Sequence, residues 1–129
     1  MKAYFSQSEK PKVPMLDVTV YNPPLNKKVR LNFIIDTGFA GGILIPLDTY
    51  VSLNLHLFES TKKVGKLATG ITIELRVSKA ILDFDGIKIP CHAYTSLGVS
   101  KNLLGREVLE KIKLTCIPKQ DKMLVEVDP

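Results

Sequence analysis

The chain has 129 residues and a formal net charge of +5 at pH 7, with 45% hydrophobic and 24% charged residues. This length fits a single domain with one core, and the composition is that of a globular protein, which excludes a disordered chain. The apolar runs are shorter than the about 20 residues that a bilayer requires, and the N-terminal "MKAYFSQSEKPK" lacks the apolar centre of a signal peptide. We therefore expect a cytoplasmic protein with no membrane partner.

The first predicted hairpin lies near the N-terminus. Leu16, Val18 and Val20 alternate with polar residues, which predicts a strand with one buried face. The turn "NPPLNKK" leads into a partner strand over 29–35. Apolar residues on both faces of this second strand indicate that it enters the interior of the protein.

The middle of the chain predicts two short elements and a second hairpin. "ILI" at 43–45 is expected to be a short buried strand. Residues 47–55 are compatible with a short helix, whose apolar side would comprise Leu47, Tyr50, Val51 and Leu55. The alternation over 62–77 predicts a hairpin with "ATG" at 68–70 as its tip.

The last third of the chain predicts a third hairpin, a helix and a closing strand. The hairpin turns at Asp85-Gly86, a dipeptide favoured in type I′ turns. "NLLGREVLEKIKLTCIP" breaks at Gly105 and then carries apolar residues at helical spacing, namely Val108, Leu109 and Ile112. "MLVEV" is the expected closing strand. The pattern of short strands and turns predicts a mostly β sandwich or barrel of six or more strands with one late α-helix over 14–129, preceded by a flexible leader at 1–13.

Asp36 is the residue that most strongly suggests chemistry. It follows the apolar run Phe33-Ile34-Ile35, and a carboxylate in such a place must be hydrogen-bonded or paired. The nearby glycines, at 38, 41 and 42, allow backbone amides to approach it closely. A simple surface turn would not need the buried flank, and the glycines match neither of the phosphate-binding patterns G-x-x-x-x-G-K-[ST] and G-x-G-x-x-G.

The stretch "DTGFAGGILIP", a hairpin at about 62–77 and "NLLG" at 102–105 before a helix occur in an order that resembles the retropepsin-like aspartic proteases. The resemblance covers nearly the whole domain and is to the small, single-lobed clan AA enzymes of bacteria and archaea. It implies a closed acid-protease barrel in which the 62–77 hairpin is a flap over an extended peptide. Retroviral enzymes usually have Ala where this chain has Phe39, which affects the neighbouring substrate pocket.

The resemblance also implies roles for individual residues. Asp36 would be the catalytic carboxylate, Thr37 would hydrogen-bond across a dimer interface, and Gly38 would contact the carboxylate through its backbone N–H. The implied substrate contacts are two pocket residues and three flap residues: Phe39, Ala40, Ala68, Thr69 and Gly70. The resemblance implies neither a metal nor a cofactor.

The reaction requires two carboxyl groups, one to activate a water and one to hydrogen-bond the scissile carbonyl. The sequence contains one Asp-Thr-Gly and no second D-[ST]-G, and it is too short for two fused lobes. The second carboxylate should therefore come from an identical chain across a two-fold axis. We expect a homodimeric aspartic endopeptidase that hydrolyses peptide or protein substrates with a bell-shaped, acid-shifted pH profile.

Three other interpretations stay open at this point. The same fold could be a catalytically silent peptide-binding or oligomerisation module. The positive net charge would favour polyanions, but the basic residues are scattered without interleaved aromatics, so we do not expect specific nucleic-acid binding. A zinc site of Cys91, His92 and Cys116 would lack a fourth ligand, and free thiols are the expected state of both cysteines.

Overall fold

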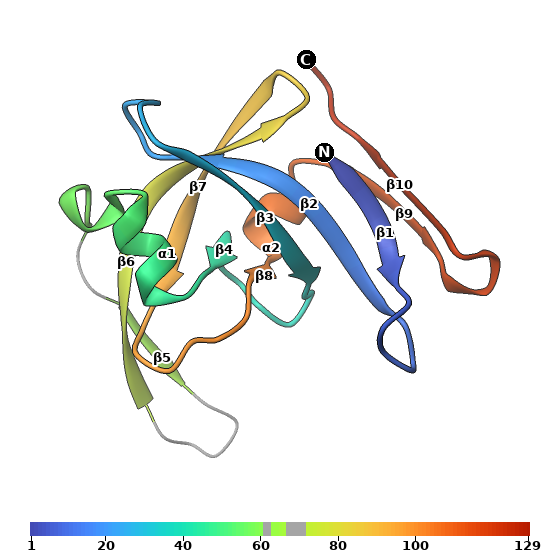
Figure 1. Ribbon diagram of the computed structural model, residues 1–129, viewed down its shortest axis with the longest axis horizontal. Helices are drawn as coiled ribbons and strands as arrows, with labels where there is room; N and C mark the ends of the chain where they lie inside the picture. The colour runs from blue at the N-terminus through green and yellow to red at the C-terminus, as the bar shows by residue number, and fades with distance from the viewer. Residues whose placement is uncertain (61–62, 67–71) are drawn as a thin grey trace.

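The computed structural model of the chain describes residues 1–60, 63–66 and 72–129, with side chains described outside 61–73. The described residues form ten strands, two α-helices and two 3-10 helices (Figure 1). The strands are β1 (Lys2–Ser6), β2 (Val13–Tyr21), β3 (Lys28–Ile35), β4 (Ile43–Leu44), β5 (Lys63–Lys66), β6 (Thr72–Phe84), β7 (Ile87–Thr95), β8 (Leu103–Leu104), β9 (Lys113–Ile117) and β10 (Lys122–Glu126). The helices are α1 (Leu47–Ser52), η1 (Leu55–Leu57), α2 (Arg106–Leu109) and η2 (Pro118–Gln120).

Eight of these strands form one sheet, in the order β1-β2-β3-β8-β4-β7-β6-β5. An additional pairing of β2 with β6 joins the sheet to itself, so that β2, β3, β8, β4, β7 and β6 make a closed circuit of hydrogen-bonded neighbours. β9 and β10 form a separate two-stranded sheet beside β1 (Figure 1). The mostly β class predicted from the sequence is confirmed.

The first hairpin has the predicted strands and turn. β2 and β3 pair antiparallel, and the alternating residues Leu16, Val18 and Val20 are each 0% exposed. The buried Asn22 side chain organises the turn, because its Oδ1 accepts hydrogen bonds from the backbone N–H groups of Asn26 and Lys27, both at 3.1 Å. Alternation and turn chemistry are local signals, which is why both could be read from the sequence.

The hairpin of β6 and β7 is also confirmed. Asp85 and Gly86 have φ angles of 52° and 98°, the positive values that a type I′ turn requires at both central positions. The Asp83 side chain accepts the Gly86 N–H at 2.7 Å and closes the turn.

The hairpin predicted over 62–77 is present where the structure describes it. β5 pairs antiparallel with β6 from Lys63↔Leu75 to Lys66↔Thr72. The predicted tip, with Ala68, Thr69 and Gly70, lies outside the described residues.

One hydrophobic core lies inside the closed circuit and under α1. Its largest fully buried side chains include Tyr50, Phe33, Phe84, Leu16, Ile43, Ile45, Leu53, Leu55, Leu82 and Leu104. β3 and β8 reach this core directly before Asp36 and Gly105, through the buried residues Ile35 and Leu104.

The prediction of a flexible leader is wrong for the first residues of the chain. Lys2–Ser6 form β1, which pairs with β2 from Lys2↔Asp17 to Ser6↔Val13, and Phe5 is only 5% exposed. The pairing covers an edge of β2 that would otherwise present unpaired backbone groups. A long-range pairing of this kind leaves no local signal in five residues.

The short helix expected over 47–55 is present as α1, which ends at Ser52; Tyr50 on its predicted apolar side is buried, whereas Val51 is 41% exposed. The late helix differs more. α2 ends at Leu109, and the chain continues from Lys113 as β9, paired with β10. Helical spacing was therefore overridden by strand pairing in the second half of this segment.

Candidate active site

Asp36 lies at the end of β3, where the chain leaves the core. β8 pairs parallel to β3 and antiparallel to β4, so "NLLG" runs between the two strands that flank the Asp36 loop, defined here as residues 36–42. Ile34 N–H donates to Asn102 O and Asp36 N–H donates to Leu104 O, each at 2.9 Å. The backbone of Asp36 is thus fixed by β8, a segment nearly seventy positions later in the sequence.

The Asp36 carboxylate is half-buried and bonded within its own loop. Its Oδ1 accepts the Gly38 N–H at 2.8 Å, and a Cβ added at Gly38 would lie 3.1 Å from the same oxygen. Thr37, Gly38 and Ala40 are exposed around it. In the part of the chain that the structure describes, no second acidic side chain hydrogen-bonds to Asp36. The Asp36 carboxylate lies at the surface of the single chain and is partly exposed.

The first turn of α2 holds the rest of the Asp36 loop. Three successive backbone amides donate to loop carbonyls: Gly105 N–H to Gly42 O at 2.8 Å, Arg106 N–H to Phe39 O at 2.8 Å and Glu107 N–H to Gly41 O at 3.3 Å. Helix N-termini have such donors free, because their first N–H groups have no partner inside the helix.

Gly105 is required by this close contact. A Cβ at this position would lie 2.2 Å from Gly41 O and 2.6 Å from Phe39 O, both backbone atoms. A side chain here would push α2 off the loop. The glycine of "NLLG" is thus explained by close approach of two backbones.

Arg106 is a site residue that the sequence reasoning missed. Its Nη1 donates to Thr37 O at 2.6 Å, so the helix also fixes the second residue of Asp-Thr-Gly. The available signal was its place directly after Gly105, but the sequence could not show that α2 lies against the Asp36 loop.

Phe39 packs inward against the scaffold. Its ring makes an edge contact with Tyr94 of β7, with ring centroids 5.8 Å apart and an interplanar angle of 83°. A Cβ at Gly41 would lie 2.6 Å from both Phe39 Cζ and Tyr94 Cε2, so the two aromatic rings enclose this glycine. The ring therefore supports the loop from the protein side, while Ala40 next to it is exposed.

A second group of missed residues lies at the base of the β5–β6 hairpin. Arg76 donates from Nε and Nη2 to the two carboxylate oxygens of Glu59, at 2.8 and 2.9 Å, and Tyr50 O–H donates to Glu59 Oε2 at 2.9 Å. Burial and the adjacent Glu59 carboxylate raise the pKa of Tyr50 above its usual value. We call Tyr50, Glu59 and Arg76 the hairpin-base group; it joins β6 to α1.

Potential ligands for a metal are sparse near these residues. Among the residues that the structure describes, no group of three or more His, Cys, Asp or Glu side chains is placed to hold an ion. Cys91 is buried and Cys116 exposed, and both are free thiols. Within the described ranges, no helix has the length and apolarity needed to cross a membrane.

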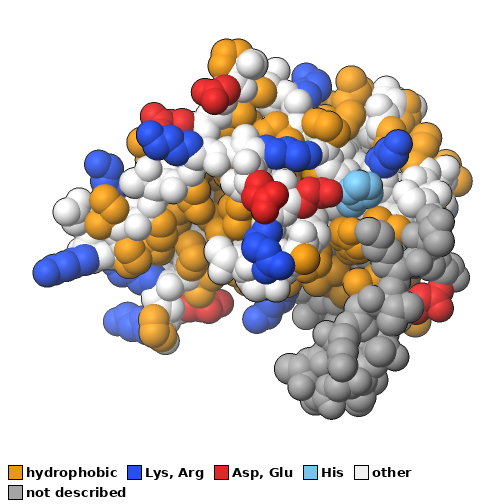
Figure 2. Space-filling model, turned by 180° about the vertical axis from the view of Figure 1, so that it is seen from behind, with side chains coloured by type: hydrophobic (Ala, Val, Ile, Leu, Met, Phe, Trp, Pro, Cys, Tyr) orange, Lys and Arg blue, Asp and Glu red, His pale blue; other side chains and the backbone are white. Residues whose placement is uncertain are grey.

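The charges do not gather on the face shown in Figure 2. There, Lys and Arg side chains are spread among Asp and Glu and separated by uncharged surface. This distribution offers no continuous basic track on that face.

Comparisons with known proteins agree with the fold. No family model matches the chain. Among solved structures, it is similar to the EIAV protease in complex with an inhibitor, with a TM-score of 0.55 and 19% identity over 79% of this chain and 89% of that one. It is also similar to a retropepsin-like aspartic protease from Rickettsia conorii, with a TM-score of 0.59 and 14% identity over 96% of this chain and 87% of that one.

A relative at the sequence level comes from an archaeon. An uncharacterized protein of Archaeoglobus fulgidus is 30% identical over 107 residues, which cover 78% of this chain and 84% of the archaeal protein. The two solved structures establish the architecture, and the archaeal sequence establishes kinship. The chain therefore has the retropepsin-like fold of aspartic proteases and belongs to the same family as the Archaeoglobus fulgidus protein.

Proposed function

We propose that this protein is an aspartic endopeptidase that acts as a homodimer, with one Asp36 from each chain. The observation that carries the proposal is the state of Asp36: its backbone is fixed by β8, its carboxylate is oriented by the Gly38 amide, and it lies half-buried next to the exposed Thr37 and Gly38. A carboxylate that is fixed in orientation and partly exposed can pair with the same group of a second chain. The fold shared with aspartic proteases supports the same conclusion.

The chemistry follows from two carboxyl groups that share one proton. The ionised Asp36 accepts a proton from a water as the water attacks the scissile carbonyl carbon, and the protonated Asp36 of the other chain hydrogen-bonds the carbonyl oxygen. Two carboxylates in contact cannot both ionise at low cost, so the pair holds a single proton over an intermediate pH range. Activity should be highest in mildly acidic solution and should fall on both sides.

The second copy is needed because the sequence has a single Asp-Thr-Gly and, among the residues that the structure describes, no other acidic side chain bonds to Asp36. Thr37 and Gly38 are exposed at the tip of the Asp36 loop, which leaves this surface free for the same loop of a partner. In the proposed dimer, Thr37 hydrogen-bonds across the two-fold axis and fixes the two loops against each other.

The substrate in this proposal is an extended peptide. It would lie between the Asp36 loops and the β5–β6 hairpins, with Phe39 and Ala40 near its side chains and the tip residues Ala68, Thr69 and Gly70 above it. An extended peptide offers backbone groups for strand-like hydrogen bonds, and a closed hairpin would exclude water. The proposal includes no metal or cofactor, and it places the protein in the cytoplasm, where free thiols are the usual state.

The decisive experiment removes the charge of Asp36 and keeps its shape. In Asp36→Asn, cleavage of a denatured protein at pH 4 to 6 should fall to background, while sedimentation shows the same dimer as wild type. Asp128→Asn, at an exposed position, removes one carboxylate elsewhere and should leave cleavage unchanged.

Two outcomes would reject the proposal. Cleavage by Asp36→Asn at the wild-type rate would remove Asp36 from the mechanism. A wild-type protein that binds a pepstatin-like transition-state mimic without turnover at any pH from 4 to 8 would instead be the silent peptide-binding module.

A further inference from the structure

The backbone N–H of His92 on β7 has its hydrogen-bond acceptor outside the β-sheet. β7 pairs parallel with β4 at Ala93 and Tyr94, and the ladder stops there. The next loop carbonyls, of Gly41 and Gly42, are already bonded to the amides of Glu107 and Gly105. The His92 N–H would therefore be left beside the Asp36 loop without a backbone acceptor.

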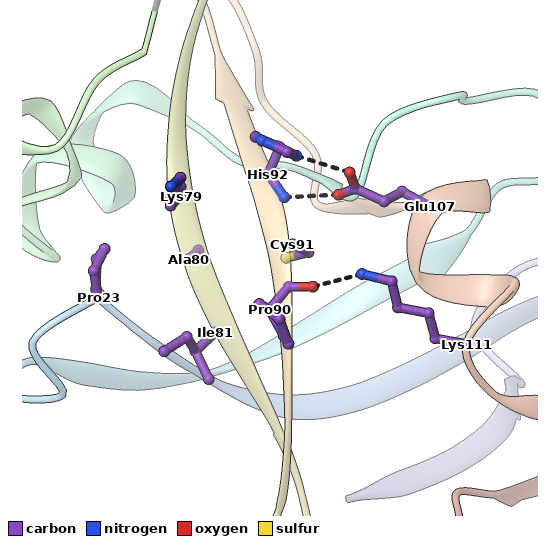
Figure 3. Close-up of a pocket in the computed structure, with 9 residues that line it drawn as sticks. All are labelled: Pro23, Lys79, Ala80, Ile81, Pro90, Cys91, His92, Glu107 and Lys111. Atoms are coloured by element: carbon purple, nitrogen blue, oxygen red, sulfur yellow. Dashed lines mark hydrogen bonds and ion pairs between the residues drawn. The ribbon is translucent and has the colours of Figure 1, made fainter.

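The Glu107 side chain supplies the missing acceptor. Its Oε1 accepts the His92 N–H at 2.7 Å, and its Oε2 lies 2.7 Å from His92 Nδ1 (Figure 3). A Cβ added at Gly42 would lie 2.6 Å from Oε1 and 2.5 Å from His92 O, so the Asp36 loop passes directly against this pair. One residue thus bonds to β7 through its side chain and to the loop through its backbone.

We propose that Glu107 is a positioning residue for Asp36: by bonding to His92, it holds β7 and α2 on the two sides of residues 39–42 and so fixes the loop that carries the carboxylate. This inference rests on the proposed protease function for its effect on activity. Its structural part, the coupling of Glu107 to the Asp36 loop, can be measured without any cleavage.

The pair is open to solvent and surrounded by other titratable groups. It lines a cavity of about 360 Å³ between β6, β7 and α2 (Figure 3). The charged and titratable groups facing His92 there are Lys79, its cross-strand partner on β6, and Cys91, Glu107 and Lys111. Lys111 Nζ donates to Pro90 O at 2.9 Å, and burial raises the pKa of the Cys91 thiol to about 12, which keeps the thiol neutral.

The pKa of Glu107 is lowered in the folded protein. Burial raises its pKa, but the backbone and side-chain hydrogen bonds of His92 more than offset this, and the pKa lies below the usual value. A lowered pKa means that the stabilising contact exists above the ordinary pKa of a Glu and is lost only as the pH falls through the lower folded value. Glu107 therefore keeps its charge, and its contact with His92, to a lower pH than an ordinary Glu would.

The charge state of His92 makes Glu different from Gln at position 107. An ionised Glu accepts a hydrogen bond from Nδ1–H whether the ring is neutral or protonated. A Gln could still accept the His92 N–H, and its NH₂ group could donate to Nδ1 of a neutral ring. Once the ring is protonated, the NH₂ group would face another donor, and that contact would be lost.

The test compares Glu107→Gln with Glu110→Gln, which makes the same change at an exposed position three residues on. In Glu107→Gln, we expect kcat for peptide cleavage to equal wild type near pH 8 and to fall about tenfold at pH 5, with KM changed less than twofold. Amide NMR signals of His92 and Gly38 should shift in the same variant at pH 5, and neither effect should occur in Glu110→Gln. In the double variant His92→Gln/Glu107→Gln, no imidazolium faces the amide, so the acid loss of kcat should be largely recovered.

The outcomes separate the two proposals. Wild-type protein without cleavage would reject the protease function, and the Gly38 signal would still test the coupling of Glu107 to the loop. A Gly38 signal unchanged at pH 5 in Glu107→Gln, or a pH profile identical to that of Glu110→Gln, would overturn the positioning role.

Discussion

The Asp36 loop and the base of the β5–β6 hairpin are both held by several hydrogen bonds, but of different kinds. The loop is fixed mainly by backbone amides of β8 and α2, at distances set by Gly105. The hairpin base is fixed by three side chains, Tyr50, Glu59 and Arg76. A backbone contact survives most substitutions and fails only when the backbones are pushed apart, whereas a side-chain contact can be removed one group at a time. The region that carries Asp36 is thus the less tolerant of the two to a change in backbone position.

The largest effect should come from Gly105→Ala. The added methyl would meet two backbone carbonyls of the Asp36 loop, so α2 must move away, and we expect a loss of about 3 kcal/mol in the free energy of unfolding. Urea unfolding measures this loss. Gly98→Ala is the control: Gly98 has a φ of 86° but no atom within 4 Å of an added Cβ, so only conformational strain of about 1 kcal/mol applies. Equal losses in the two variants would contradict the role of close approach at Gly105.

A smaller effect is expected at the hairpin base from Tyr50→Phe. The ring stays in the core, and only the hydrogen bond to Glu59 is lost, which should cost about 1 kcal/mol at pH 7. The variant should also change the pH dependence. Because the pKa of Tyr50 is raised in the folded protein, its contribution is complete below the ordinary tyrosine pKa and is lost as the pH rises through the higher folded value.

Thermal unfolding between pH 8 and pH 11 measures this difference. The stability of the wild type should decline more steeply than that of Tyr50→Phe above about pH 10. Tyr21→Phe, at a half-buried position on β2, is the matched control and should keep the steeper decline. Parallel curves for wild type and Tyr50→Phe would show that Glu59 and burial do not hold the Tyr50 proton.

The smallest effect is expected from Arg76→Met. The variant keeps the apolar stem and removes the guanidinium, whose ion pair with Glu59 is partly exposed, so the loss of unfolding free energy should be under about 1 kcal/mol. The difference from wild type should shrink in 1 M salt, because salt screens exposed charges. A loss that matches Gly105→Ala, or one that does not respond to salt, would remove the contrast between the two regions.

Much of the fold could be predicted because its signals are local. Alternation marks β2 and β3 in the first hairpin, and Asp85-Gly86 is a turn that the dipeptide itself favours. The position of Asp36 after a buried strand was also visible, because an acidic residue behind three apolar ones is a pattern of neighbours. Its catalytic role, the dimer and the hairpin-tip contacts stay predictions.

What the sequence by itself determined is the run of hairpins and the presence of one acidic residue at the end of a buried strand, since both depend on residues a few positions apart. Only the tertiary structure decided the contacts between distant segments. These are the pairing of β1 with β2, the pairing of β9 with β10 where the helix was expected to continue, and the hydrogen bonds of Arg106 to Thr37 and of Glu107 to His92. Such contacts depend on where the closed circuit of strands brings two backbones together. No local spacing encodes that distance, so the residues that hold the Asp36 loop could be recognised only in the folded chain.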